Sequence, residues 1–138
     1  PRLRLTPARE AAYAATGLAM LVLLLAFPRQ GYPLVWTWGV FALDPLCTRL
    51  GKRSFAADLS RGDWRPWIAL WAGGLLCGCF WELWNYWSYP KWIYHVPYVD
   101  SAKVFEMPLL GYLGYLPFAM QLWLLAQLLL PRGPRVEL

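Results

Sequence analysis

A carboxyl group and an amide lie inside an apolar, aromatic run of this sequence. Glu82 and Asn85 stand within "FWELWNYWSY", residues 80–89. A carboxyl group removed from water is costly unless it is protonated or meets a hydrogen-bond donor. Two kinds of chemistry therefore fit: a polar cluster that joins helices, or an acid–base group that exchanges a proton. The polar cluster is the interpretation that we favour.

Further polar groups follow this run and could join the same cluster. We predict a buried polar cluster of five side chains: Glu82, Asn85, Tyr86, His95 and Glu106. In the alternative interpretation, Glu82 and Glu106 are catalytic, and they donate and accept protons in an intramembrane reaction on an isoprenoid or lipid. Asp44 lies apart from this cluster, and we expect it to pair with a nearby cation: Arg49, Lys52 or Arg53.

The sequence contains no recognisable metal-binding or nucleotide-binding motif. It has a single histidine, which excludes a haem bound by two histidines of this chain. The Glu-x-x-His pair of di-iron proteins is absent, and the spacing of Cys77 and Cys79 does not fit zinc. The cysteine count of three is odd, so we expect small buried thiols rather than a disulfide framework. We therefore predict no metal site.

The rest of the chain is rich in apolar and aromatic residues. Of its 138 residues, 59% are hydrophobic and 15% are charged, and ten are tryptophan. A soluble domain of this length does not bury so much apolar surface, so the composition predicts a single integral membrane domain over residues 1–138. The net charge of +5 lies in short segments beside apolar runs, which is typical of membrane topology rather than of nucleic-acid binding.

Four apolar runs predict an all-α, polytopic membrane protein with about four transmembrane helices. The runs cover residues 8–27, 33–48, 66–89 and 108–130, and an aromatic interfacial loop at 90–107 joins the last two. The second run is short for a full crossing and contains Pro45. Pro117 predicts a kink inside the fourth run, because proline removes a backbone donor.

The distribution of basic residues predicts the orientation in the membrane. With four spans, the N-terminal segment, the loop at 48–65 and the C-terminal segment share one side, and they carry ten of the 13 Lys and Arg residues. Basic residues concentrate on the cytoplasmic side of a membrane. We therefore expect a protein of the bacterial inner (cytoplasmic) membrane with both termini in the cytoplasm.

Glycines and aromatic residues indicate how the helices pack. Gly74 and Gly78 form a small-x-x-x-small pattern, and Glu82 follows one turn later on the same face, so that face should meet a neighbouring helix. We also assign Gly111 and Gly114 to helix packing. Tryptophan and tyrosine favour the membrane–water interface, and five such residues define the predicted interface: Trp81, Trp84, Trp87, Trp92 and Tyr94.

Four segments are similar to a family of small, uncharacterised bacterial multi-helix integral membrane proteins. The segments are "LDPLCTRLGKRSF", "DLSRGDWRPW", "GCFWELWNYWSYPKWIYHVP" and "KVFEMPLLGYLGYLPFAMQ", and the resemblance covers roughly residues 34–124. Members of the family carry a W-E-x-W-N-Y-W block and an E-M-P-L-x-G-[YF]-L-G-[YF]-x-P-F block. The resemblance implies a multi-helix membrane fold and no particular activity. Its motif positions are Trp81, Glu82, Asn85, Tyr86, Trp87, Lys91, Trp92, Glu106, Met107, Pro108, Gly111 and Gly114.

The sequence favours a non-catalytic membrane subunit that packs against and stabilises a larger complex. The chain is small, rich in Trp and Gly, and poor in catalytic groups. We expect other membrane protein subunits and lipid as its partners, and a respiratory or photosynthetic assembly as the host. The aromatic density suits contact with lipid, carotenoid, quinone or chlorophyll, and no cofactor is specified. The alternative is the intramembrane acid–base enzyme described above.

Overall fold

The computed structural model describes residues 6–95 and 102–130, and within them the chain is mostly helical. This confirms the all-α class, with one small hairpin added. The longer helices are α1 (Pro7–Ala26), α3 (Trp38–Arg49), α5 (Arg65–Trp87) and α6 (Tyr115–Leu129). The shorter elements are α2 (Pro28–Gly31), η1 (Tyr32–Val35), α4 (Phe55–Arg61), β1 (Lys103–Val104), β2 (Met107–Pro108) and η2 (Leu109–Gly114).

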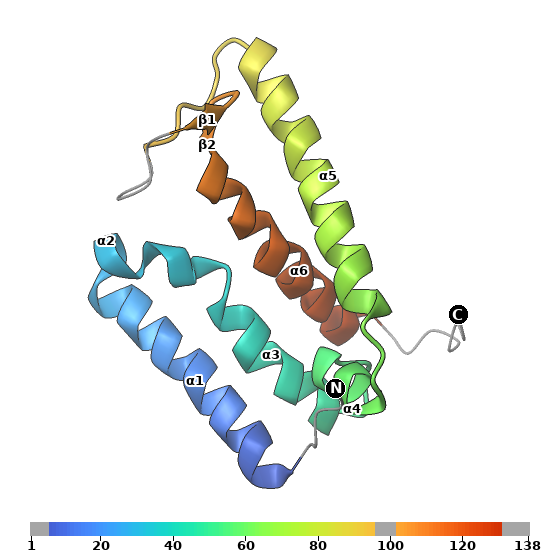
Figure 1. Cartoon of the computed structure of the whole chain (residues 1–138). Coiled ribbons are helices and arrows are strands. Elements are labelled where there is room, and N and C mark those ends of the chain that lie inside the picture. The colour runs from blue at the N-terminus through green and yellow to red at the C-terminus, as the bar shows by residue number, and fades with distance from the viewer. Residues whose placement is uncertain (1–5, 96–101, 131–138) are drawn as a thin grey trace.

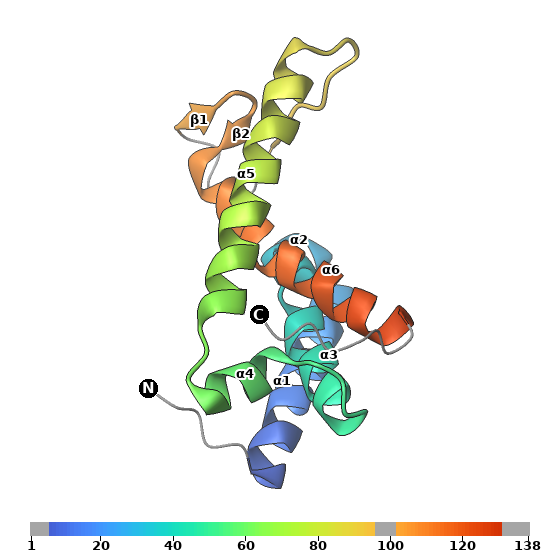
Figure 2. The same cartoon turned by 90° about the vertical axis from the view of Figure 1, so that its right-hand side faces the viewer.

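The helices form two antiparallel pairs. α1 packs on α3, α5 packs on α6, and α3 joins the two pairs through α6. Figure 1 shows α4 at one end of the molecule and the β1–β2 hairpin at the opposite end. In the perpendicular view of Figure 2, α5 stands away from the α1–α3 pair along much of its length. One side of α5 is therefore left without a neighbour among the described residues.

The second predicted span, 33–48, differs from the structure. Among the described residues, three helical segments are long and apolar enough to cross a membrane: Pro7–Ala26, Arg65–Trp87 and Leu109–Leu129. They match the first, third and fourth predicted runs. The second run is divided between the 3₁₀ turn η1 and the 12-residue helix α3, and a helix of 12 residues is about 18 Å long, shorter than the bilayer core. The structure thus supports three candidate spans rather than four.

The fourth run also differs in detail from the sequence-based expectation. It begins as the 3₁₀ helix η2 and becomes α-helical at Tyr115, so Pro117 falls in the first turn of α6 rather than inside a continuous helix. Proline is tolerated in a first turn, where its missing N–H has no intrahelical partner. The predicted kink is replaced by the change from 3₁₀ to α-helix before the proline.

A compact core lies at the end of the molecule that contains α4. The aromatic ring of Phe55 is fully buried there and contacts Trp67 of α5 and Trp123 of α6, at centroid distances of 5.4 and 4.7 Å. The core also includes Val40, Cys47, Met120 and Leu124. α4 therefore packs against α3, α5 and α6 at this end of the molecule.

Asp44 fixes the position of α4 through its backbone. The carboxylate is fully buried, and it accepts hydrogen bonds from the N–H groups of Phe55 (2.6 Å) and Ala56 (3.0 Å). A carboxylate at the start of a helix satisfies amides that have no partner within the helix. The expected ion pair of Asp44 with Arg49, Lys52 or Arg53 was wrong, because backbone amides occupy both carboxylate oxygens.

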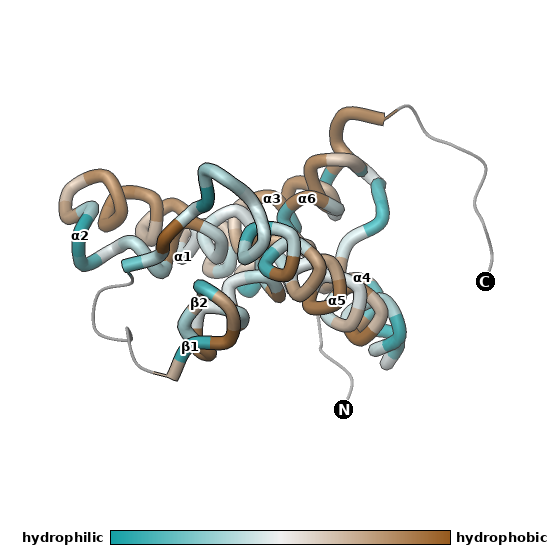
Figure 3. The backbone as a smooth tube through the Cα atoms, turned by 90° about the horizontal axis from the view of Figure 1, so that it is seen from above, coloured by the Kyte–Doolittle hydropathy of each residue, from teal (hydrophilic) through white to brown (hydrophobic). Residues whose placement is uncertain are grey.

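Much of the apolar surface faces outward. Only 6% of the apolar window of α1 and 11% of that of α5 is buried inside the chain. Figure 3 shows long hydrophobic stretches in α1 and α6, with hydrophilic residues near α2 and α4. Monomeric soluble proteins rarely expose apolar patches this extensive. The structure is therefore that of a membrane protein by the composition of its helices.

The two glycines Gly73 and Gly78 of α5 provide a direct test of the α5–α6 contact. A Cβ atom at Gly78 would lie 2.5 Å from the ring of Tyr115, whereas one at Gly73 would meet nothing within 4 Å. We expect Gly78→Leu to destabilise the protein by about 1–3 kcal/mol through overpacking. Gly73→Leu is the matched control and should leave the thermal unfolding temperature in detergent unchanged. Equal effects of the two substitutions would contradict this close contact between α5 and α6.

Candidate functional site

Glu82 lies at the centre of a polar cluster between α5, α6 and the segment that follows α5. Its side chain is fully buried, and the hydroxyl groups of Tyr94 and Tyr115 both donate to its Oε1 atom at 2.9 Å. Its other oxygen, Oε2, is buried without a hydrogen-bond partner among the described residues. Oε1 of Glu82 thus links α5 to α6 and to the segment after α5, whereas Oε2 makes no hydrogen bond to the described residues.

Asn85 anchors the backbone of the same segment. Its side-chain amide donates to the carbonyl oxygen of Trp92 at 2.8 Å and accepts from the N–H of Trp92 at 2.7 Å. Asn85 is 5% exposed, so these bonds are shielded from competing water. The two-way contact holds the chain after α5 against the last turns of that helix. We refer to Glu82, Asn85, Tyr94, Tyr115 and Trp92 as the Glu82 cluster.

A second layer of contacts ties the β1–β2 hairpin to this segment. Lys91 forms an ion pair with Glu106, and its ammonium group lies 5.1 Å from the ring centre of Tyr86. Lys103 donates to the carbonyl oxygen of Tyr94 at 3.0 Å. The hairpin turns at Phe105, whose φ of 56° is in the left-handed region. Residues 90–95 and 102–107 are therefore held together, while the middle of the predicted loop at 90–107 lies outside the described residues.

The buried cluster has fewer members than predicted. Glu82 and Asn85 are buried, but Tyr86 is 42% exposed and His95 is also exposed. Glu106 is partly buried and pairs with Lys91, so it belongs to the contacts of the hairpin rather than to the buried cluster in which it was predicted. The sequence assigns Tyr94 to the membrane interface, and the predicted cluster includes neither the hydroxyl of Tyr115 nor the backbone of Trp92, which are partners in the structure.

Helix packing explains why Glu82 meets Tyr115. Gly74 would place a Cβ atom 2.9 Å from the carbonyl oxygen of Tyr115, and Gly78 allows the Tyr115 ring to lie directly on α5. The hydroxyl of that ring then reaches Glu82, one turn further along α5. The predicted packing role of Gly74 and Gly78 agrees with this geometry. Gly111 lies against Met107 of its own segment, and Gly114 faces Trp36 of the first half of the chain.

The predicted interface aromatics occupy the outer surface near the Glu82 cluster. Four of them are more than half exposed: Trp81 (54%), Trp84 (67%), Trp87 (79%) and Trp92 (69%). Tyr94 is the exception, because its hydroxyl points inward to Glu82. Burial, followed by the hydrogen bond to Glu82, raises the pKa of Tyr94 to about 12. The phenol therefore keeps its proton at neutral pH and remains a hydrogen-bond donor.

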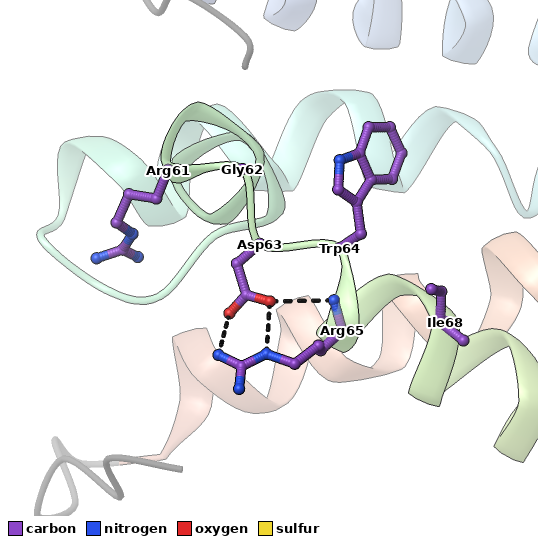
Figure 4. A pocket seen from close by; sticks show the side chains of 6 residues that line it. All are labelled: Arg61, Gly62, Asp63, Trp64, Arg65 and Ile68. Carbon is purple, nitrogen blue, oxygen red and sulfur yellow. Dashed lines mark hydrogen bonds and ion pairs between the residues drawn. The ribbon is translucent and has the colours of Figure 1, made fainter. Parts of the chain in front are cut away.

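An open hollow lies at the junction of α4 and α5, at the other end of α5 from this cluster. It has a volume of about 410 Å³, and Figure 4 shows that two of its lining side chains, Arg65 and Asp63, are bonded to each other. The hydrogen bonds from Arg65 lower the pKa of Asp63 to about 2. Arg61, on the same hollow, pairs with Asp58. The three charged side chains that line the hollow thus each have an ion-pair partner within the chain.

Neither a metal cluster nor a disulfide is present in the described parts of the chain. No group of three or more His, Cys, Asp or Glu side chains is close enough there to hold a metal ion. Cys47 is buried, as expected, but Cys77 and Cys79 are exposed on α5, so the expectation of three buried thiols was wrong for two of them.

No protein-family model, curated protein or solved structure matches this chain. The resemblance to small bacterial membrane proteins stays a prediction from the sequence.

Proposed function

We propose that this protein is a non-catalytic subunit of a membrane complex, and that the outer face of α5 packs against a partner helix. The observation that carries the proposal is a stripe of small residues at a spacing of four, Ala69, Gly73 and Cys77, which is exposed. Small residues allow two membrane helices to approach closely, whereas contact with lipid does not require them. Gly73 has open space around it in this chain.

The state of the acidic side chains also favours a structural role. Asp44 caps α4, Asp58 pairs with Arg53 and Arg61, and Glu106 pairs with Lys91. A catalytic carboxyl group must instead reach a substrate. Glu82 is fully buried and accepts two internal hydrogen bonds, as expected of a group that holds the fold together.

The complex itself is proposed on the sequence alone. The aromatic content suits a respiratory or photosynthetic host with quinone, carotenoid or chlorophyll nearby. We also propose that both termini are cytoplasmic and that α3, with η1 before it, crosses the membrane as a shortened fourth span. In support, α1 and α5 run toward the hairpin end of the molecule and α3 and α6 run back (Figure 1).

Substitution of Gly73 tests the proposal, because Gly73→Leu adds bulk outside this chain rather than inside it. We expect the tagged wild-type protein to copurify from native membranes with a stoichiometric partner. Gly73→Leu should fold normally but lose that partner. Ala19→Leu, on the exposed side of α1, is the matched control and should retain it. Retention of the partner by Gly73→Leu, or the absence of any stoichiometric partner in the wild type, would contradict the proposed role.

One observation favours the second candidate, an intramembrane acid–base enzyme. The Oε2 atom of Glu82 is buried and has no partner among the described residues, so it is the one carboxylate oxygen of the Glu82 cluster that a proton or a substrate group could occupy. The Glu82 substitutions considered in the Discussion distinguish the two candidates.

A further inference from the structure

An apolar groove of about 210 Å³ lies between α1 and α3, on the first helix pair and away from the Glu82 cluster. It is lined by Ala14, Leu18, Ala42, Pro45, Leu46 and Arg49. Five of these side chains are apolar, and the sixth is a cation in the last turn of α3. Because α1 is long and apolar enough to cross a membrane, a groove along its side follows the direction of lipid acyl chains.

The groove exists because of small residues near a close helix contact. A Cβ atom at Gly17 would lie 2.5 Å from the backbone nitrogen of Ala42, so the two helix backbones nearly touch at this point. Ala14, almost one turn earlier on α1, and Ala42 on α3 are too small to fill the space beside the contact. Leu18 and Leu46 form its edges and are 58% and 43% exposed, so the groove is open to the surrounding lipid.

The cation at the end of the groove is available to a ligand. Arg49 is exposed and makes no ion pair within the described residues. Three other cations at this end of the molecule are already occupied: Arg53 and Arg61 pair with Asp58, and Lys52 donates to the carbonyl groups that end α6. A guanidinium group binds phosphate through two parallel hydrogen bonds. Its charge therefore complements an anionic head group.

We propose that the groove between α1 and α3 binds one acyl chain of an anionic phospholipid, and that Arg49 binds the phosphate of its head group. The lipid belongs to the leaflet nearest the C-terminal end of α3. Basic sites between membrane helices bind anionic head groups in this way, and apolar side chains supply the contact with the chain. The proposal rests on the membrane location given under Proposed function, but it requires neither a protein partner nor catalysis.

Native mass spectrometry of the purified full chain in detergent tests the proposal. The probes are dioleoyl phosphatidylglycerol, dioleoyl phosphatidylcholine with the same acyl chains, and glycerol phosphate as the head group without chains. We expect the wild-type protein to retain one phosphatidylglycerol in preference to phosphatidylcholine, and to retain no glycerol phosphate. Equal retention of the two lipids, or binding of glycerol phosphate alone, would overturn the proposal.

Four variants assign the binding to the groove. Arg49→Gln should weaken phosphatidylglycerol binding about fivefold and abolish the preference, as expected for the loss of one basic residue near an anionic lipid. Ala14→Leu, which fills the groove, and Leu46→Gln, which makes its edge polar without adding bulk, should reduce the retention of both lipids.

Arg29→Gln is the matched control at the other end of α1 and should behave as wild type. An unchanged preference in Arg49→Gln, or an equal loss in Arg29→Gln, would refute the assignment, and so would full lipid retention by a folded Leu46→Gln protein. Copurification with a protein partner is a separate measurement, so this proposal and the proposed function can fail independently.

Discussion

Asp44→Ala is expected to be among the most destabilising single substitutions in this chain. It removes a fully buried carboxylate that accepts hydrogen bonds from the backbone N–H groups of Phe55 and Ala56. Hydrogen bonds to charged groups contribute about 1.5–3 kcal/mol each, and two buried amides would lose their partner. We therefore expect a loss of about 3–5 kcal/mol in the free energy of unfolding. The loss should appear as a large drop in thermal unfolding temperature in detergent.

Two further variants show whether the carboxylate itself is responsible. Asp44→Asn keeps the size of the side chain but presents an NH₂ group to one of the two amides, so it should recover only part of the stability. Asp63→Ala removes the carboxylate at the next helix start, which pairs with the exposed Arg65, and it should have little effect. A similar unfolding temperature for Asp44→Ala and Asp63→Ala would show that α4 is not held by this contact.

Most of the helical framework can be predicted from the sequence, and the exception has a physical cause. Runs of about 20 apolar residues have one reasonable structure in a bilayer, and α1, α5 and the segment Leu109–Leu129 follow that rule. The start of the second run and the two residues before it read "GYPLVWTWG" (31–39), where a proline and two glycines favour irregular backbone, and the structure places a 3₁₀ turn there. Hydropathy alone does not reveal that a helix is interrupted at such a point.

The residues of the candidate site were predictable, whereas their partners were not. Glu82 stands out because a carboxyl group in an apolar run needs a donor, and the Gly74–Gly78 spacing fixes the face on which it lies. The choice among several nearby Tyr, Trp and Asn donors depends on how the segment after α5 folds back. The same limit explains Asp44: its partners are backbone amides that only the position of α4 brings within reach. The spacing of residues in the sequence does not predict contacts between a side chain and a distant backbone amide.

Glu82→Leu is expected to release the segment that follows α5. The substitution leaves the hydroxyl groups of Tyr94 and Tyr115 without their acceptor in a buried site, at a cost of about 1–3 kcal/mol for each group. Because Tyr94 lies in the segment after α5 and Tyr115 in α6, both attachments weaken together. Trypsin cleavage after Lys91 reports this release, because Lys91 lies in the same segment, three residues before Tyr94. We expect faster cleavage and a lower unfolding temperature than in the wild type.

Glu82→Gln separates the structural role of Glu82 from a catalytic one. The glutamine keeps an oxygen that can accept from both tyrosines, but it has no proton to exchange at the position of Oε2. If Glu82 is structural, Glu82→Gln should retain slow cleavage after Lys91 and normal recovery of the partner complex, while Glu82→Leu loses both. Tyr94→Phe should show an intermediate effect, because it removes one of the two hydrogen bonds. A Glu82→Gln protein that is folded and complexed, yet fails to support the process that requires this protein in cells, would instead favour the acid–base role, because the amide keeps an acceptor for both tyrosines but cannot exchange a proton.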